Sequence, residues 1–164
     1  MNNRGITLIE LLIVVAIIGI IVAIAIPNLL AAVQRARQKR TMADIKAVAT
    51  VWESYFVDYA YYYPGGGCSQ IDGLSLPAMR LIFSSLAAEL QPTYISKIPW
   101  NDGWNRPFYF YTDVSASAQS YKIESWGKDG ASDDYCGSTT SFDNDIVLFT
   151  GQFLEWPEGP QAAK

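Results

Sequence analysis

The stretch RGITLIELLIVVAIIGIIVAIAIP, residues 4–27, decides the fold of this chain. Between residues 6 and 26 only Thr7 and Glu10 are strongly polar. A helix of that length spans about 31 Å at about 1.5 Å per residue, which matches the hydrocarbon core of a bilayer. The sequence therefore predicts a membrane-spanning helix over residues 6–30.

The helical pattern continues beyond the apolar stretch. Apolar side chains recur every three or four residues at Ile45, Val48, Trp52, Tyr55 and Tyr59. This spacing predicts an amphipathic helix over residues 31–60, with its aromatic stripe packed on a globular body. Residues 6–60 would then form one long stalk.

The remainder, residues 61–164, has the pattern of a small head. Residues 76–90 predict a short helix, and the runs 108–112, 121–126 and 146–149 predict strands separated by turn residues. The expected fold class is α+β, with a long N-terminal helix packed on a small antiparallel sheet. The tail at residues 155–164 contains prolines and a glycine and is expected to be mobile.

Charge and composition exclude several functions. From residue 47 onward there are 14 acidic and 6 basic residues, a net charge of −8, so the body is not expected to bind nucleic acid through its phosphates. The chain contains no histidine, which excludes Ser-His-Asp catalysis and histidine-based zinc sites. A membrane-anchored enzyme using Asp102, Asp129 and Asp143 as acid and base is conceivable. No other motif supports it, and we expect no enzyme.

Glu10 lies where an ionised side chain is energetically unfavourable. A carboxylate inside a membrane helix costs about 2.5–3.5 kcal/mol on insertion scales and usually has a partner. One alternative is that Glu10 extends to the nearby headgroups. The other is that it pairs with a positive group when subunits assemble.

The N-terminus resembles that of type IV pilins and type II secretion pseudopilins. The family has a short basic leader ending in glycine, then an apolar residue, then Thr-Leu-apolar-Glu, and MNNRG followed by ITLIE fits this pattern. The resemblance implies removal of the leader (residues 1–5) by a prepilin peptidase between Gly5 and Ile6, and N-methylation of Ile6. The family usually has Phe where this chain has Ile6. Thr7 and Glu10 would act in assembly, with Glu10 paired to the Ile6 amine of a neighbouring subunit.

The same resemblance assigns a role to Pro27. The family carries a proline here, and its helix is locally unwound in filaments. Since proline cannot donate the helical hydrogen bond, residues from Gly19 to Pro27 are expected to be helical in the membrane and partly melted after assembly.

Three stretches of the body resemble the major pseudopilin of type II secretion: DGWNRPFYF (102–110), YKIESWGKDG (121–130) and FDNDIV (142–147). In that family the last loop binds calcium. The resemblance implies carboxylate ligands at Asp129 and Asp143, the carbonyl of Trp126, and Asp145 as a further ligand. The open alternative is a solvated acidic loop without a metal.

The two cysteines, Cys68 and Cys136, are expected to form a disulfide, and free thiols are the alternative. A disulfide would place the body outside the cytoplasm. The expected function is a structural subunit of a homo-oligomeric helical filament. The subunit would sit in the bacterial inner membrane and then be assembled by dedicated machinery. The leading interpretation is a periplasmic pseudopilus that helps export folded proteins. The alternatives are a cell-surface pilus for adhesion, motility or DNA uptake, and a lone membrane-tethered adhesin.

Overall fold

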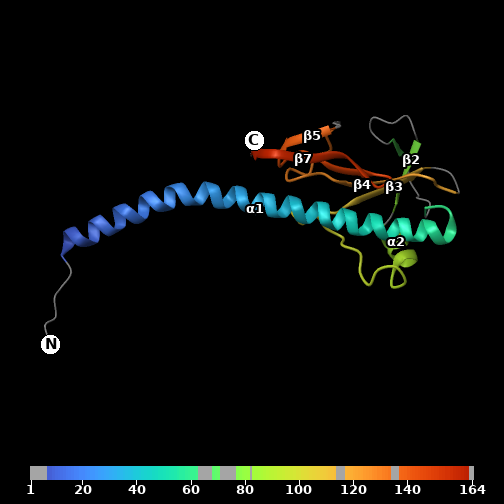
Figure 1. The fold of residues 1–164 in the computed structure, drawn as a ribbon, viewed down its shortest axis with the longest axis horizontal. Coiled ribbons are helices and arrows are strands. Elements are labelled where there is room, and N and C mark those ends of the chain that lie inside the picture. The colour runs from blue at the N-terminus through green and yellow to red at the C-terminus, as the bar shows by residue number, and fades with distance from the viewer. Residues whose placement is uncertain are drawn as a thin grey trace.

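The computed structural model describes residues 7–62, 68–70, 77–81, 83–113, 117–133 and 137–162. Its dominant element is α1 (Leu8–Tyr59), a single helix of 52 residues. The first half of α1 extends away from the rest of the molecule, and the second half lies along the head (Figure 1). The predicted stalk of residues 6–60 is therefore confirmed from Leu8 onward.

The head is built on one seven-stranded sheet with the order β1-β2-β3-β4-β6-β7-β5. Its strands are β1 (Cys68–Gln70), β2 (Pro77–Leu81), β3 (Tyr109–Asp113), β4 (Tyr121–Ser125), β5 (Gly137–Ser141), β6 (Ile146–Phe149) and β7 (Gln152–Ala162). All neighbouring strands are antiparallel except β5 and β7, which are parallel. The α+β class is confirmed, and the sheet is mixed at one edge.

The core lies between the second half of α1 and one face of the sheet. Trp52 of α1 is fully buried, and its ring contacts Tyr121 at 5.0 Å and Phe110 at 6.2 Å between centroids. Helix α2 (Phe83–Leu90) adds Leu86 and Leu90, both fully buried. The aromatic stripe predicted along α1 is thus the packing surface of the head.

Two predictions about the head were wrong. The helix predicted over residues 76–90 begins only at Phe83, because residues 77–81 form β2 and pair with β3. The tail predicted to be mobile forms most of β7, which pairs with β6 and β5. In both cases strand pairing overrides the local pattern: β2 pairs with β3, which lies far along the chain, and β7 pairs with its neighbour β6 and with β5.

Candidate functional site

The first half of α1 presents apolar side chains in all directions. Between Leu8 and Val33 every large apolar side chain is at least 41% exposed. An 18-residue window of the helix has a mean hydropathy of 3.2, and none of it is buried in the molecule. Because water does not favour such a surface, this half of α1 needs a membrane or other protein chains around it.

The start of α1 is closed by a reciprocal cap. The backbone N–H and the hydroxyl of Thr7 donate to Oε2 of Glu10, each at 3.0 Å, and the N–H of Glu10 donates to Oγ1 of Thr7 at 3.3 Å. The structure brings these two predicted assembly residues together. The Thr-x-x-Glu spacing is a readable capping-box signature that the sequence reasoning missed. Gly5 and Ile6 lie outside the described residues.

α1 runs without a break through Gly19 and Pro27. Pro27 has no N–H to donate to the carbonyl one turn earlier. The side-chain amide of Asn28 donates to the carbonyl of Ile24 at 3.1 Å, which adds a bond beside the proline. The segment from Gly19 to Pro27 is therefore helical in the single chain. Its melting on assembly stays a prediction.

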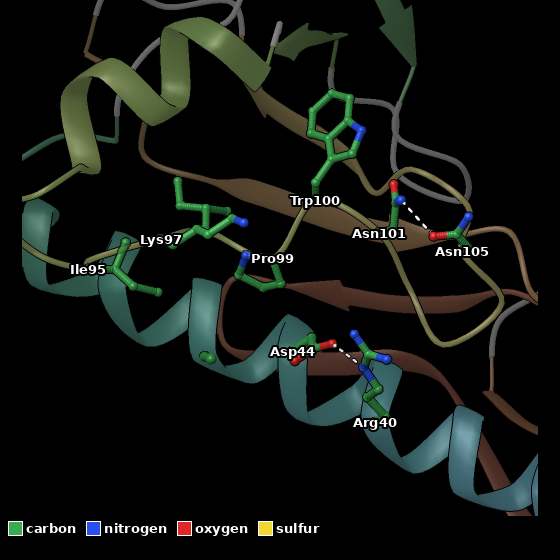
Figure 2. A pocket seen from close by; sticks show the side chains of 10 residues that line it. Arg40, Asp44, Ile95, Lys97, Pro99, Trp100, Asn101 and Asn105 are labelled. Carbon is green, nitrogen blue, oxygen red and sulfur yellow. Dashed lines mark hydrogen bonds and ion pairs between the residues drawn. The ribbon is translucent and has the colours of Figure 1, made fainter.

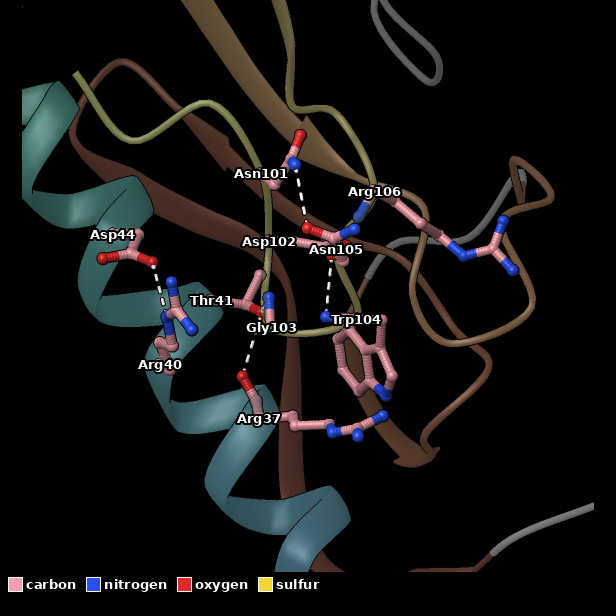
Figure 3. A network of polar contacts seen from close by, with 10 residues as sticks. All are labelled: Arg37, Arg40, Thr41, Asp44, Asn101, Asp102, Gly103, Trp104, Asn105 and Arg106. Carbon is pink, nitrogen blue, oxygen red and sulfur yellow. Dashed lines mark hydrogen bonds and ion pairs between the residues drawn. The ribbon is translucent and has the colours of Figure 1, made fainter.

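A short loop, residues 101–106, contacts the middle of α1 and holds the head against it (Figure 3). The N–H of Gly103 donates to Oγ1 of Thr41 at 2.9 Å, and Nε1 of Trp104 donates to Oε1 of Gln34 at 2.7 Å. A side chain at Gly103 would place its Cβ 2.2 Å from the carbonyl oxygen of Arg37. The loop therefore depends on glycine for its close approach to the helix.

Asp102 holds this loop in shape. Its Oδ1 accepts from the N–H groups of Trp104 at 2.8 Å and Arg106 at 2.9 Å, and its Oδ2 accepts from the hydroxyl of Ser125 at 2.7 Å. The side chain is 2% exposed. Since both carboxylate oxygens already accept hydrogen bonds from the protein, the geometry gives Asp102 a structural role.

An open pocket of about 550 Å³ lies beside this junction, between α1 and the segment leading into the loop (Figure 2). Ile95, Ile98, Pro99 and Trp100 contribute its apolar walls. Arg40 and Lys97 contribute positive charge, and Arg40 forms an ion pair with Asp44 at 3.4 Å. Its mixed lining and open shape are those of a surface hollow that could receive part of another chain.

The predicted calcium ligands have contacts of their own within the protein. Asp129 accepts from the N–H of Ala131 at 3.0 Å, and Asp143 forms an ion pair with Lys128 at 3.4 Å. The carbonyl of Trp126 accepts from the N–H of Gly130 at 2.9 Å, and its ring stacks on Tyr109. Within the described ranges, no three acidic or cysteine side chains lie close enough together to hold a metal ion.

Asp145 behaves differently from the other three. It is fully buried, and its Oδ2 accepts from the N–H of Asp133 at 3.0 Å. Glu155 of β7 is also fully buried, and neither of its carboxylate oxygens has a hydrogen-bond partner among the described residues. Burial above all raises the pKa of each group to about 8. Glu155 was not among the predicted ligands.

The proposed disulfide falls partly outside the structure that can be described. Cys68 lies in β1, where its backbone pairs with Met79 of β2. Cys136 lies outside the described residues.

Two family models match the chain. The model of the prokaryotic N-terminal methylation motif matches residues 1–26, and the model of type II secretion system (T2SS) protein G matches residues 28–146. Together they reach from the first residue into the start of β6. β7 lies beyond both.

Curated relatives fall into two groups. The type II secretion system core protein G of Escherichia coli K12 is 27% identical over 132 residues, covering 79% of this chain and 84% of that protein. The type IV major pilin protein PilA of Myxococcus xanthus is 50% identical over 61 residues, which span 37% of this chain and only 28% of the pilin. The type IV wide pilus major component PilA4 of Thermus thermophilus is 39% identical over 87 residues, covering 53% of this chain and 66% of that protein. No solved structure matches the chain significantly.

Proposed function

This chain belongs to the type II secretion system protein G family, and from that premise we propose that it is the structural subunit of a secretion pseudopilus. The observation that carries the proposal is the first half of α1, which is apolar all round and uncovered in the single chain. Before assembly the bilayer would cover it. In the filament the same surface would be covered by neighbouring copies of α1.

The junction with the head divides α1 into a half that packs on the head and a half that is left for the membrane or the filament to cover. The loop at residues 101–106 holds the helix from Gln34 onward, and the core packs on it from Ile45 onward. The head therefore decorates the outside of the filament while residues 8–33 pack inside it. Any change of helix shape on assembly falls in the free half, where Gly19 and Pro27 stand.

Glu10 favours transfer of the subunit from the membrane into the filament. Within the described part of the single chain, its carboxylate accepts hydrogen bonds from Thr7 of the same helix. After cleavage behind Gly5, the amine of Ile6 on a neighbouring subunit would offer a full positive charge. An ion pair is worth more in a water-poor core than at an exposed site, so the exchange favours the assembled state.

A surface pilus is the second candidate, favoured by the higher identity of the matched stretches to PilA and PilA4. Those two matches cover only 37% and 53% of this chain. The matches to core protein G extend over the head as well, at 79% of this chain. The head therefore favours the pseudopilus.

Deleting the gene and restoring it separates the two candidates. For a pseudopilus subunit, the deletion strain retains proteins in the envelope that the wild type releases into the medium, and its surface fibres are unchanged. For a pilus subunit, fibres disappear from the sheared surface fraction while protein release continues. The restored gene must reverse whichever defect appears.

A further inference from the structure

Exposed basic residues surround α1 just after its apolar half. The apolar side chains of Leu29, Leu30 and Val33 are still exposed. The positions that follow carry a group of exposed positive charges, called here the basic belt: Arg35, Arg37, Lys39 and Arg40. An apolar helix surface that ends in such a group of charges is typical of a membrane-spanning helix where it leaves the bilayer.

The basic belt occupies the part of the helix circumference that the head leaves open. Gln34, Gln38 and Thr41 lie on the side of α1 that faces the head, since all three form hydrogen bonds with it. Successive residues of an α-helix are rotated by about 100°, so the residues of the basic belt point to the remaining sides. The head therefore does not separate them from a surface that surrounds α1.

Most of the charge of the basic belt has no partner inside the chain. Arg40 forms an ion pair with Asp44 at 3.4 Å. In the part of the chain that the structure describes, the side chains of Arg35, Arg37 and Lys39 take part in no ion pair. Three positive charges within five residues repel one another, so an anionic surface beside them is favourable.

The length of α1 places the basic belt at a headgroup layer. Glu10 is least unfavourable at the edge of the hydrocarbon core, because its charge then lies near the headgroups. Arg35 and Arg40 lie about 38 and 45 Å further along the helix at about 1.5 Å per residue, whereas the hydrocarbon core is about 30 Å thick. Side chains of a helix are tilted toward its N-terminus, which here means back toward the bilayer. The basic side chains therefore reach the headgroups on the side of the head.

We propose that the basic belt binds the phosphate groups of acidic phospholipids at the membrane surface nearest the head. Arginine and lysine donate charge-assisted hydrogen bonds to phosphate, and arginine does so with two donors at once. Such binding would fix the depth of α1 in the bilayer and hold the head at its surface.

The bilayer is favoured over the acidic head of a neighbouring copy as the occupant. A neighbouring head lies beside the basic belt only after assembly. In the single chain the bilayer already covers the apolar surface that ends at Val33, and the basic belt continues that surface. The inference rests on the membrane state in the proposed function, and it is the same for a pseudopilus and a surface pilus.

Lipid binding to the full-length chain in detergent micelles tests the proposal. Phosphatidylglycerol or phosphatidylcholine is titrated in, and native mass spectrometry counts the bound lipid molecules; the two lipids share the phosphate and differ in net charge. The wild type is expected to bind phosphatidylglycerol at least about fivefold more tightly, which is the gain from one basic residue near an acidic surface. In the triple variant Arg35→Gln, Arg37→Gln, Lys39→Gln this preference is expected to fall below about twofold.

Two control variants separate the effects of charge and position. Arg35→Lys combined with Arg37→Lys keeps every charge and is expected to keep the preference. Lys46→Gln removes an exposed cation about 54 Å along the helix from Glu10, beyond the headgroups, and is expected to change nothing. Near-ultraviolet circular dichroism verifies that each variant is folded, and resistance to an alkaline wash of cell membranes verifies that each spans the bilayer.

The outcomes distinguish this proposal from the proposed function. A wild type that the alkaline wash removes from membranes would refute the membrane state on which both depend. A folded, membrane-embedded wild type without a preference for phosphatidylglycerol would overturn the lipid proposal alone, and so would a triple variant that keeps the preference. A triple variant that keeps the preference but forms no filaments would instead assign the basic belt to contacts between copies.

Discussion

Gly103 shows at the scale of one residue how the head is fixed to the helix. Its missing side chain lets the loop donate a hydrogen bond to Thr41, and an added Cβ would lie 2.2 Å from the backbone oxygen of Arg37. Gly103→Ala is expected to destabilise the head by about 1–3 kcal/mol, the usual cost of overpacking. Chemical unfolding of the full chain in micelles measures this. Gly19→Ala, where the Cβ meets nothing within 4 Å, is the control, and equal stability of the two variants would contradict the account.

The second prediction for a single residue concerns the role of Glu10 in assembly. Glu10→Leu removes the charge that makes the membrane state unfavourable, so the variant is expected to accumulate in the membrane and to form few or no filaments. Glu89→Leu makes the same change at an exposed glutamate of α2 and is expected to assemble normally. Filament yield in sheared and envelope fractions, by immunoblot and electron microscopy, gives the answer. Wild-type yield from Glu10→Leu would mean that pairing of this carboxylate does not drive assembly.

The site was only partly predictable from individual residues. Thr7 and Glu10 could be identified because a polar pair in an apolar stretch is conspicuous, and the structure places them in contact. Glu124 and Glu155 could not, since charged residues in a strand are normally solvated. Their burial follows from the pairing of β4, β6 and β7, which depends on contacts distant in sequence.

At the scale of elements, α1 is joined to the sheet through a buried tyrosine. The hydroxyl of Tyr121 in β4 donates to Glu53 of α1 at 2.8 Å, and burial followed by this bond raises the pKa of Tyr121. A raised pKa in the folded state means that the contribution to stability is present below pH 10 and is lost as the pH rises further. Unfolding measured between pH 8 and pH 11 is expected to show this loss.

Tyr121→Phe removes the titrating group at this contact. The variant is expected to be about 0.5–1.5 kcal/mol less stable at neutral pH, from the lost hydrogen bond, and to lose less stability above pH 10. An identical alkaline loss in wild type and Tyr121→Phe would exclude Tyr121 as its source.

The free half of α1 yields a prediction about helix shape. Proline costs about 3 kcal/mol in a helix interior and glycine about 1, so Gly19→Ala with Pro27→Ala makes the helix much harder to melt. If assembly requires melting, the double variant is expected to remain in the membrane with a head of unchanged stability. Filament yield and head unfolding are the two readouts. Normal filaments from the double variant would show that melting of this segment is dispensable.

The elements themselves differ in how far the sequence predicts them. α1 can be predicted from the sequence because its 52 residues carry an apolar and then an amphipathic helical pattern without interruption. β3, β4 and β6 are strand-like runs bounded by turn residues, and the sequence predicts each of their ends to within one residue. For β7 the local sequence predicts a mobile tail, because Pro157, Gly159 and Pro160 normally end strands. Its pairing with β5 in parallel and with β6 in antiparallel orientation supplies the order that the local sequence does not.

At the scale of the whole molecule, the chain has one self-sufficient part and one dependent part. The head and the second half of α1 bury their apolar residues together, while the first half of α1 buries none. A fragment lacking the first 28 residues retains every junction contact from Gln34 onward. It is expected to be soluble, folded and monomeric, as sedimentation and circular dichroism would measure. A fragment that aggregates or assembles into filaments would contradict this division.

The central claim is that the uncovered half of α1 is the core of a filament. Cryo-electron microscopy of filaments isolated from cells at native expression tests it most directly. We predict that residues 8–33 pack against the same residues of neighbouring subunits at the filament axis, with the heads outside. Filaments in which this half of α1 lies away from the axis, or a chain that stays dispersed in the membrane under conditions where its secretion system is active, would contradict the account.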